Sequence, residues 1–169
     1  MILEEPSGLV PVLAARAEVI VVAQRVMRQI ATAIGATGSS IEASLEDRDG
    51  WNDDPPRTMR CEVVGRIDGP AVTAERLAAT ITRCGLHLTT VEPAEPDDPY
   101  GRITIMASAP GSSVTLRVFG FHPLEYIRLE NPDHRYDVAV SSPWFLLSED
   151  VESKYDVLID YDVSLDSSP

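Results

Sequence analysis

Residues 11–35 read PVLAARAEVIVVAQRVMRQIATAIG, and this stretch decides the first layer of the fold. Its largest apolar side chains recur every seven residues, at Leu13, Ile20, Met27 and Ile34. Smaller apolar residues run beside them and the arginines lie off the stripe, so the spacing predicts a long amphipathic helix over residues 11–34. Pro11 suits the first helical position, and Gly35 suits the position after the last.

The chain after this helix changes to the period of a half-buried strand. Apolar and polar residues alternate over residues 41–46 and again over 59–67, which predicts two strands. Thr73 can then cap a second helix that runs to Cys84, and Gly85 can close it.

From residue 86 onward the alternation is almost continuous. Pro110-Gly111 suits a turn between two of the strands, so a hairpin is expected there. The order of helix, two strands, helix and then antiparallel strands predicts an α+β fold, mainly an antiparallel sheet with two helices packed on one face. The predicted later strands cover residues 86–91, 102–109, 113–121, 124–130, 135–141 and 155–163.

A length of 169 residues fits a single domain over residues 1–169, which ends in an acidic segment, 148–169. The net charge is −13, of which residues 121–169 contribute −8 with 11 acidic and 3 basic side chains. This balance disfavours nucleic acid and anionic lipids as partners and favours a basic protein.

The N-terminus lacks the positive region of an export signal, because Glu4 and Glu5 stand there. The apolar residues 9–23 include charges and a proline, so no membrane span is expected. We therefore expect a cytoplasmic protein if Met1 is the native start, and a cell-envelope protein if the chain has been trimmed.

Cys61 is predicted on the inward face of a strand and Cys84 on the inward face of the following helix. A disulfide between them would close a 24-residue loop, which is worth about 3 kcal/mol in the chain-entropy model. Two buried thiols that act as small apolar residues are the other interpretation, and the lack of an export signal favours it.

No cofactor, metal or catalytic site is predicted. The three histidines, His87, His122 and His134, do not have the spacing of metal ligands. The Gly35–Ser40 stretch lacks the lysine of a phosphate-binding loop. The C-terminal aspartates do not form a calcium-binding loop, because Leu165 occupies the position that requires glycine.

The predicted last strand carries one acidic face, and the motif Tyr-Asp-Val occurs in it twice. Its carboxylates could bind arginines of a protein partner. Alternatively, the charges could protect a sheet edge from association. The partner-binding candidates are Tyr155, Asp156, Asp160, Tyr161 and Asp162.

Residues 9–147 resemble the small actinobacterial cell-envelope lipoproteins of the LppA type. The resemblance rests on the N-terminal helix, a strand pair with Cys61, a helix that ends in Cys84-Gly85, the segment Tyr100–Ile105 and the motif Ser141-Ser142-Pro143-Trp144-Phe145. The chain has no lipobox cysteine, and Trp144 stands where those proteins tend to have a cysteine. The resemblance implies an α+β fold and a bacterial origin, with no catalytic residue to carry over.

The sequence therefore leads to two hypotheses about function. The first is a non-enzymatic acidic binding protein, such as an immunity or inhibitor protein that masks a basic site on a protein partner. The second is the soluble domain of a lipoprotein-like envelope protein that binds a small ligand or an envelope component, and it predicts the Cys61–Cys84 disulfide.

Overall fold

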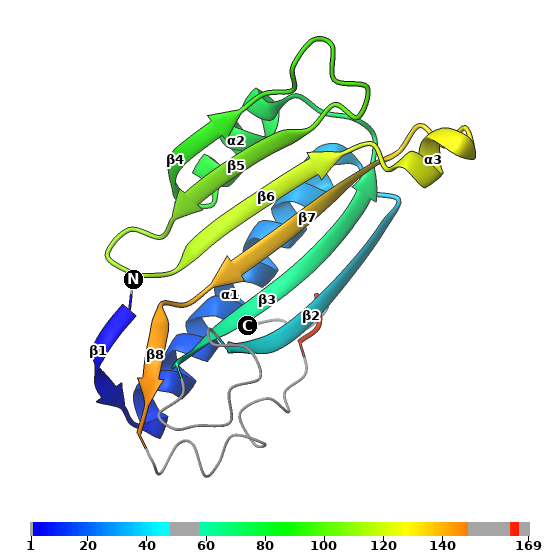
Figure 1. Ribbon diagram of the computed structural model, residues 1–169. Helices are drawn as coiled ribbons and strands as arrows, with labels where there is room; N and C mark the ends of the chain where they lie inside the picture. Colours follow the sequence, from blue (N-terminus) through cyan, green and yellow to red (C-terminus); the bar gives the residue numbers. More distant parts are fainter. Residues whose placement is uncertain (1, 48–57, 149–162, 166–169) are drawn as a thin grey trace.

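The computed structural model describes residues 2–47, 58–148 and 163–165 of the chain (Figure 1). The first helix, α1, spans Leu9–Ile34 and confirms the predicted amphipathic helix. It begins two residues before Pro11, which therefore takes the third position of the first turn, where a backbone N–H has no partner within the helix. Gly35 follows α1 with a φ of 68°, the left-handed conformation that favours glycine.

The second helix, α2, spans Ala74–Arg83 and also confirms its prediction. The Thr73 side chain accepts a 3.2 Å hydrogen bond from the backbone N–H of Arg76, as a helix cap should. Glu75 in the first turn and Arg83 in the last complement the helix dipole.

The described strands form one eight-stranded sheet in which β3 pairs with three other strands. β3 pairs with β2 along one side, and with β7 and then β8 along the other. β6, β5 and β4 continue the sheet beyond β7. The strands are β1 (Ile2–Ser7), β2 (Gly38–Asp47), β3 (Thr58–Gly69), β4 (His87–Glu92), β5 (Ile103–Ser108), β6 (Thr115–Phe121), β7 (His134–Ser141) and β8 (Trp144–Leu147).

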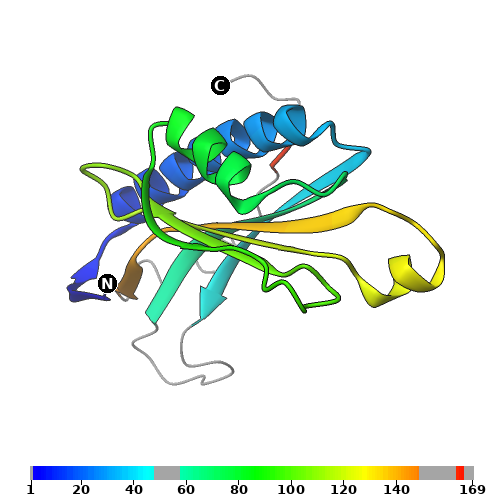
Figure 2. The same ribbon diagram turned by 90° about the horizontal axis from the view of Figure 1, so that it is seen from above.

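Both long helices lie on the same face of this sheet (Figure 2). α1 packs on β3 and β7, while α2 packs on β4, β5 and α1. All strand pairs are antiparallel except that of β1 with β8. The predicted α+β fold, with two helices on one face of a mainly antiparallel sheet, is confirmed.

The strand predicted at 124–130 is wrong, because this segment forms a short helix, α3 (Leu124–Arg128). None of the α3 residues is buried, so the alternation in this stretch does not reflect one buried strand face. The helix begins directly after Pro123 and projects beyond the end of the sheet, between β6 and β7 (Figure 1).

Two strands were not expected from the sequence. β1 at the N-terminus pairs in parallel with β8, which lies between the predicted strands at 135–141 and 155–163. The predicted strand at 155–163 lies outside the described residues except for its last residue, so it stays a prediction.

The buried apolar side chains form a main cluster and a second, smaller one. The main cluster joins the inward face of α1 to α2 and to the strands from β3 to β7. The second lies at the N-terminal end of α1, where Val12 packs with Met59, Cys61, Phe145 and Leu147. Apolar side chains of β8 and of the first residues of β3 thus pack against the N-terminal end of α1.

Gly65 on β3 lies directly beneath the side chain of Met27 on α1. A Cβ atom built on Gly65 would overlap the sulfur and terminal methyl of Met27. Gly120 on β6 has a similar role, since a Cβ there would lie 2.8 Å from side-chain atoms of both Ile103 and Tyr136. These glycines let buried side chains rest directly on the backbone of the sheet.

We expect Gly65→Ala to lower the free energy of unfolding by about 1–3 kcal/mol, because Met27 must leave its position. Gly8→Ala is the matched control, since a Cβ on Gly8 meets no atom within 4 Å. Chemical denaturation of both variants measures the difference. Equal stability of the two variants would contradict the close packing of α1 on β3.

Candidate functional site

The residues predicted to bind a partner all fall in a part of the chain that lies outside the described residues. They are Tyr155, Asp156, Asp160, Tyr161 and Asp162. Their assignment therefore stays a prediction. The structure describes only the residues before and after this acidic stretch, residues 149–162.

The residues that follow the acidic stretch are attached to α1. Val163 and Leu165 pack against the main core cluster. Gln24 Nε2 donates a 2.7 Å hydrogen bond to the carbonyl of Ser164, and Arg28 Nε donates a 2.8 Å bond to that of Leu165. Gln24 is buried although it is polar, and this hydrogen bond satisfies it. The C-terminal side of the acidic stretch is thus fixed to the folded body.

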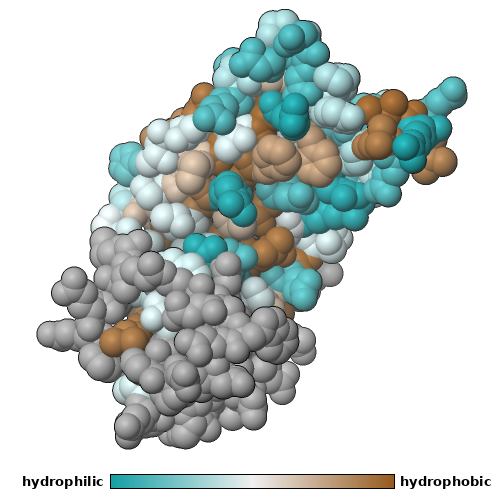
Figure 3. Space-filling model, in the orientation of Figure 1, coloured by the Kyte–Doolittle hydropathy of each residue, from teal (hydrophilic) through white to brown (hydrophobic). Residues whose placement is uncertain are grey.

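The sheet surface that faces away from the helices is uncovered by any described helix, and we call it the open face. Its centre is apolar, because Val64 is 39% exposed, Met106 42% and Phe119 36%. Ala139 lies between Val64 and Arg117 in the strand register and leaves room around them. We call Val64, Met106, Phe119 and Ala139 the central patch; Figure 3 views the open face, with hydrophobic residues at its centre.

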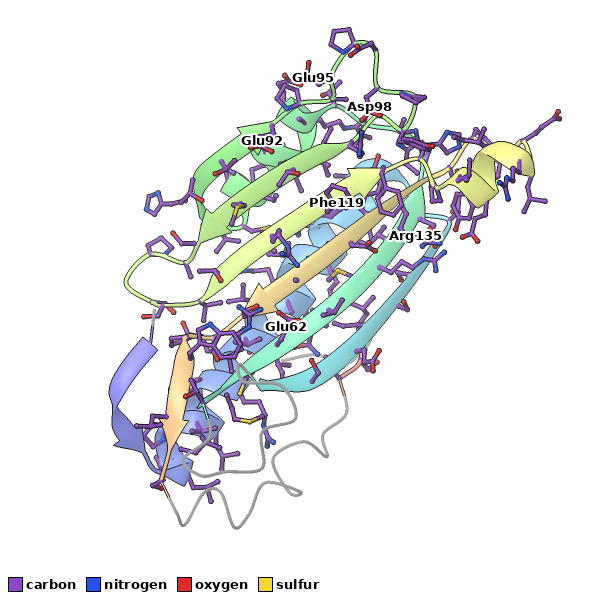
Figure 4. All side chains as sticks on the ribbon, viewed as in Figure 1. Glu62, Glu92, Glu95, Asp98, Phe119 and Arg135 are labelled. Atoms are coloured by element: carbon purple, nitrogen blue, oxygen red, sulfur yellow. The ribbon has the colours of Figure 1, made fainter. Side chains whose placement is uncertain are left out.

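Val64, Phe119 and Ala139 of the central patch line an open concavity of about 600 Å³, and Met106 lies outside its lining. Glu62, Arg117 and Asp137 line it together with Phe119 and Val64. Figure 4 shows Phe119 on β6 and Glu62 on β3, with β7 between the two strands. A ligand in this concavity would contact apolar side chains and, beside them, charged side chains of both signs.

Charged residues alternate along β3 on the open face. Arg60 forms a 3.1 Å ion pair with Glu62, and its guanidinium lies 4.6 Å from the centre of the Trp144 ring. Further along, Arg66 pairs with Asp68 at 3.2 Å. The two pairs are partly exposed, so each contributes little to stability.

A polar network connects β3 to α3 at the far end of the open face. Arg66 Nη2 donates a 2.7 Å hydrogen bond to the Tyr126 hydroxyl, which donates a 2.9 Å bond to Asp68 Oδ1. Arg135 forms a 2.9 Å ion pair with Glu125. α3 is therefore held by polar contacts, while apolar side chains of its segment remain exposed.

Asp137 lies on β7 beside this network. Burial raises the pKa of its carboxyl group, and the nearby charges of Arg135 and Arg66 oppose that rise. Asp137 forms no ion pair or hydrogen bond with another described residue. Arg117, on the neighbouring strand, likewise has no ion pair within the described part of the chain.

A second charged surface is the acidic loop, which we define as residues 92–102 between β4 and β5. Glu92, Glu95 and Asp97 are exposed on it and form no ion pairs with described residues. The loop lines an open concavity of about 970 Å³, which shares Thr104 with the concavity of the central patch. Its carboxylates can therefore meet a ligand that also reaches the edge of the open face.

Asp98 organises the acidic loop. Its carboxylate accepts hydrogen bonds from Arg102 Nε at 2.9 Å, and from the backbone N–H groups of Tyr100 and Arg102 at 3.0 Å each. These donors, above all the Arg102 side chain, lower the pKa of Asp98 to about 2. Asp98 is not among the site residues predicted from the sequence, although its spacing from Arg102 and the surrounding prolines are a local signal.

Two histidines that are distant in sequence come together at the base of α3. The rings of His122 and His134 stack with their centres 4.9 Å apart. His122 Nε2 donates a 2.8 Å hydrogen bond to the carbonyl of Asn131. Burial and the neighbouring His122 lower the pKa of His134. Among the described residues, no group of three or more His, Cys, Asp and Glu side chains is arranged to hold a metal ion.

The cysteines are free and buried. Cys61 belongs to the second core cluster and Cys84 to the main one, so they pack against different parts of the sheet. The structure thus has two buried thiols and no Cys61–Cys84 disulfide, because the two sites are separate.

Comparison with known proteins gives no assignment. No protein-family model, curated protein or solved structure matches the chain. The resemblance to the LppA-type lipoproteins therefore stays a prediction. Among the described residues, no helix combines the length and the apolar character that a membrane crossing requires.

Thiol titration checks the cysteine environment. Burial raises the pKa of Cys61 to about 11 and also raises that of Cys84, so little thiolate exists near neutral pH. We expect neither thiol to react at an appreciable rate in the folded protein, and both to react once it is unfolded without reductant. Absence of titratable thiols in the unfolded protein would show a disulfide instead.

Amide exchange checks the role of Asp98. Because the pKa is lowered, the ionised carboxylate should order the loop at any pH above the ordinary value of 3.8, and this order should be lost as pH falls through about 2. Asp98→Ala should abolish protection of the Tyr100 and Arg102 amides at neutral pH. Asp97→Ala, a change at the exposed neighbouring carboxylate, should leave it intact; equal protection in both variants would contradict the role.

Proposed function

We propose that this chain is a non-enzymatic acidic binding protein that masks a basic site on a protein partner, in the manner of an immunity or inhibitor protein. The residues proposed to contact the partner are Tyr155, Asp156, Asp160, Tyr161 and Asp162. Carboxylates bind arginine and lysine through charge-assisted hydrogen bonds, and tyrosine adds apolar contact area with a polar tip.

The observation that carries the proposal is the attachment of the chain on both sides of the acidic stretch. On the N-terminal side, β8 pairs with β3, and Phe145 and Leu147 lie in the second core cluster. On the C-terminal side, Ser164 and Leu165 accept hydrogen bonds from α1. The described residues on both sides of 149–162 are therefore attached to the domain, and attachment of a binding segment at both ends lowers the entropy that is lost when it binds.

The charge distribution supports the same class of partner. The chain has 27 acidic and 14 basic residues, and the acidic loop adds a further set of exposed carboxylates. A potential of this sign attracts basic proteins and speeds their association, and this effect weakens as salt concentration rises.

The envelope-domain hypothesis has less support. It predicts a Cys61–Cys84 disulfide, whereas the two thiols are free and lie in separate clusters. Neither concavity around the acidic loop or the central patch is enclosed enough to bury most of a small ligand, as binding pockets usually do.

Two variants with the same change in net charge test the proposal. The first neutralises the C-terminal segment with Asp156→Asn, Asp160→Asn and Asp162→Asn. The second neutralises the acidic loop with Glu92→Gln, Glu95→Gln and Asp97→Asn. Each removes three negative charges, so a difference between them reports position and not overall charge.

The measurement is recovery of a stoichiometric partner from the source cell, followed by titration of the purified pair at low and high salt. We expect the C-terminal variant to weaken binding by at least about tenfold, because several close charge pairs are lost, and the loop variant to bind nearly as wild type. A partner that is indifferent to both variants and to salt, or no partner at all, would overturn the proposal.

A further inference from the structure

The open face differs in charge from the rest of the molecule. On β3, β6 and β7 it carries four arginines and three carboxylates, while the whole chain has a net charge of −13. The face is therefore close to neutral on a strongly acidic protein. The charged residues on these three strands are Arg60, Glu62, Arg66, Asp68, Arg117, Arg135 and Asp137. Glu42 on β2 lies opposite Val64 and Glu92 on β4 lies opposite Thr104, so these two carboxylates share the face and bring its total to five carboxylates and four arginines.

We propose that the open face is self-complementary and that two copies of this chain pair through it as a twofold-symmetric dimer. The central patch supplies the apolar contact. Val64 on β3, Phe119 on β6 and Met106 on β5 are each between 36% and 42% exposed. In the strand register Ala139 lies between Val64 and Arg117, and Met106 lies on the other side of Arg117. Covering such side chains removes apolar surface from water, which is the main favourable term in association.

The strand register places two opposite charges symmetrically about the patch. Arg117 lies opposite Ala139, and Phe119 lies opposite Asp137, on adjacent antiparallel strands. Strands are about 4.8 Å apart and alternate residues about 7 Å apart along them, so these four side chains mark the corners of a small rectangle. Arg117 and Asp137 occupy one diagonal, and Ala139 and Phe119 the other.

A twofold axis close to the Ala139–Phe119 diagonal brings the two charges together across the interface. Such an axis places Arg117 of each copy over Asp137 of the other, which gives two equivalent ion pairs. It also places Phe119 against the Phe119 of the second copy, with Ala139 leaving space beside it. Arg117 and Asp137 have no ion pair within the described part of one chain, so neither must give up a partner.

A second copy fits this face better than a basic protein does. A face with nearly equal numbers of arginines and carboxylates gives a basic surface no strong net attraction, whereas two such faces attract each other when opposite charges are in register. Five strands of about seven residues present roughly 1,100 Å² over two copies, which reaches the size of a stable interface. Repulsion between the other carboxylates is screened beyond about 8 Å at physiological salt.

The proposal does not depend on the proposed function, because the pairing is argued from residues of β3, β5, β6 and β7 and requires no basic partner. The chain could dimerise without a basic partner, and it could bind a basic partner as a monomer. The test therefore uses the purified full chain alone.

Sedimentation velocity over a hundredfold range of concentration, at physiological salt, should show the wild type reaching twice the 18.4 kDa mass of one chain. Arg117→Glu and Asp137→Arg should each weaken the dimer at least tenfold, because each places like charges together twice. An equimolar mixture of these two variants should dimerise again. In the mixed pair, the glutamate introduced in one copy faces the arginine introduced in the other, and the second contact is the native ion pair.

A further pair of variants controls for effects on folding. Phe119→Glu places two carboxylates near the axis and should give a monomer, whereas Leu129→Glu alters a side chain that is 76% exposed on the α3 segment and should leave the dimer intact. A wild type that stays monomeric throughout would overturn the proposal. So would folded single variants that remain apart when mixed, or a Phe119→Glu variant as dimeric as wild type.

Discussion

The packing of α1 against β3 determines how the surface of this protein is divided. Gly65 has no side chain, so Met27 rests directly on the strand, and the helix lies against β3 and β7. Side chains alternate along a strand, and a shift by one residue would exchange the two faces. Residues such as Val63 and Ile67 therefore lie under the helix, whereas Glu62 and Val64 of the same strand lie on the open face.

The regular parts of the fold could be predicted because their periodicity is local. α1, α2 and the β5–β6 hairpin follow from apolar spacing, a threonine cap and a Pro-Gly turn. The segment 124–130 also alternates, but it lies beyond the sheet, where no neighbouring strand and no core select a strand. β1 could not be predicted, because its strand state depends on parallel pairing with β8, which lies far along the chain.

The site depends on pairings that one sequence does not reveal. β7 inserts between β6 and β3, so residues distant in sequence, such as Arg117 and Val64, lie on either side of Ala139. The stacking of His122 on His134 has the same non-local origin. The acidic composition of the loop could be seen in the sequence, whereas the open face appeared there only as unrelated alternating residues. The amino-acid composition therefore predicts a basic partner, whereas the pairing order of the strands determines which charged residues lie together on the open face.

The two proposed surfaces act over different ranges, and this makes them compatible. Unpaired carboxylates act at a distance and respond strongly to salt, while the central patch acts only in contact. A dimer through the open face would carry two copies of residues 149–162 and two acidic loops. A basic partner with more than one binding site would then gain from effective concentration, and its avidity could exceed the affinity of a single contact by a factor of about 10² or more. Dimer formation through the open face would thus increase the affinity of the acidic residues for a basic partner.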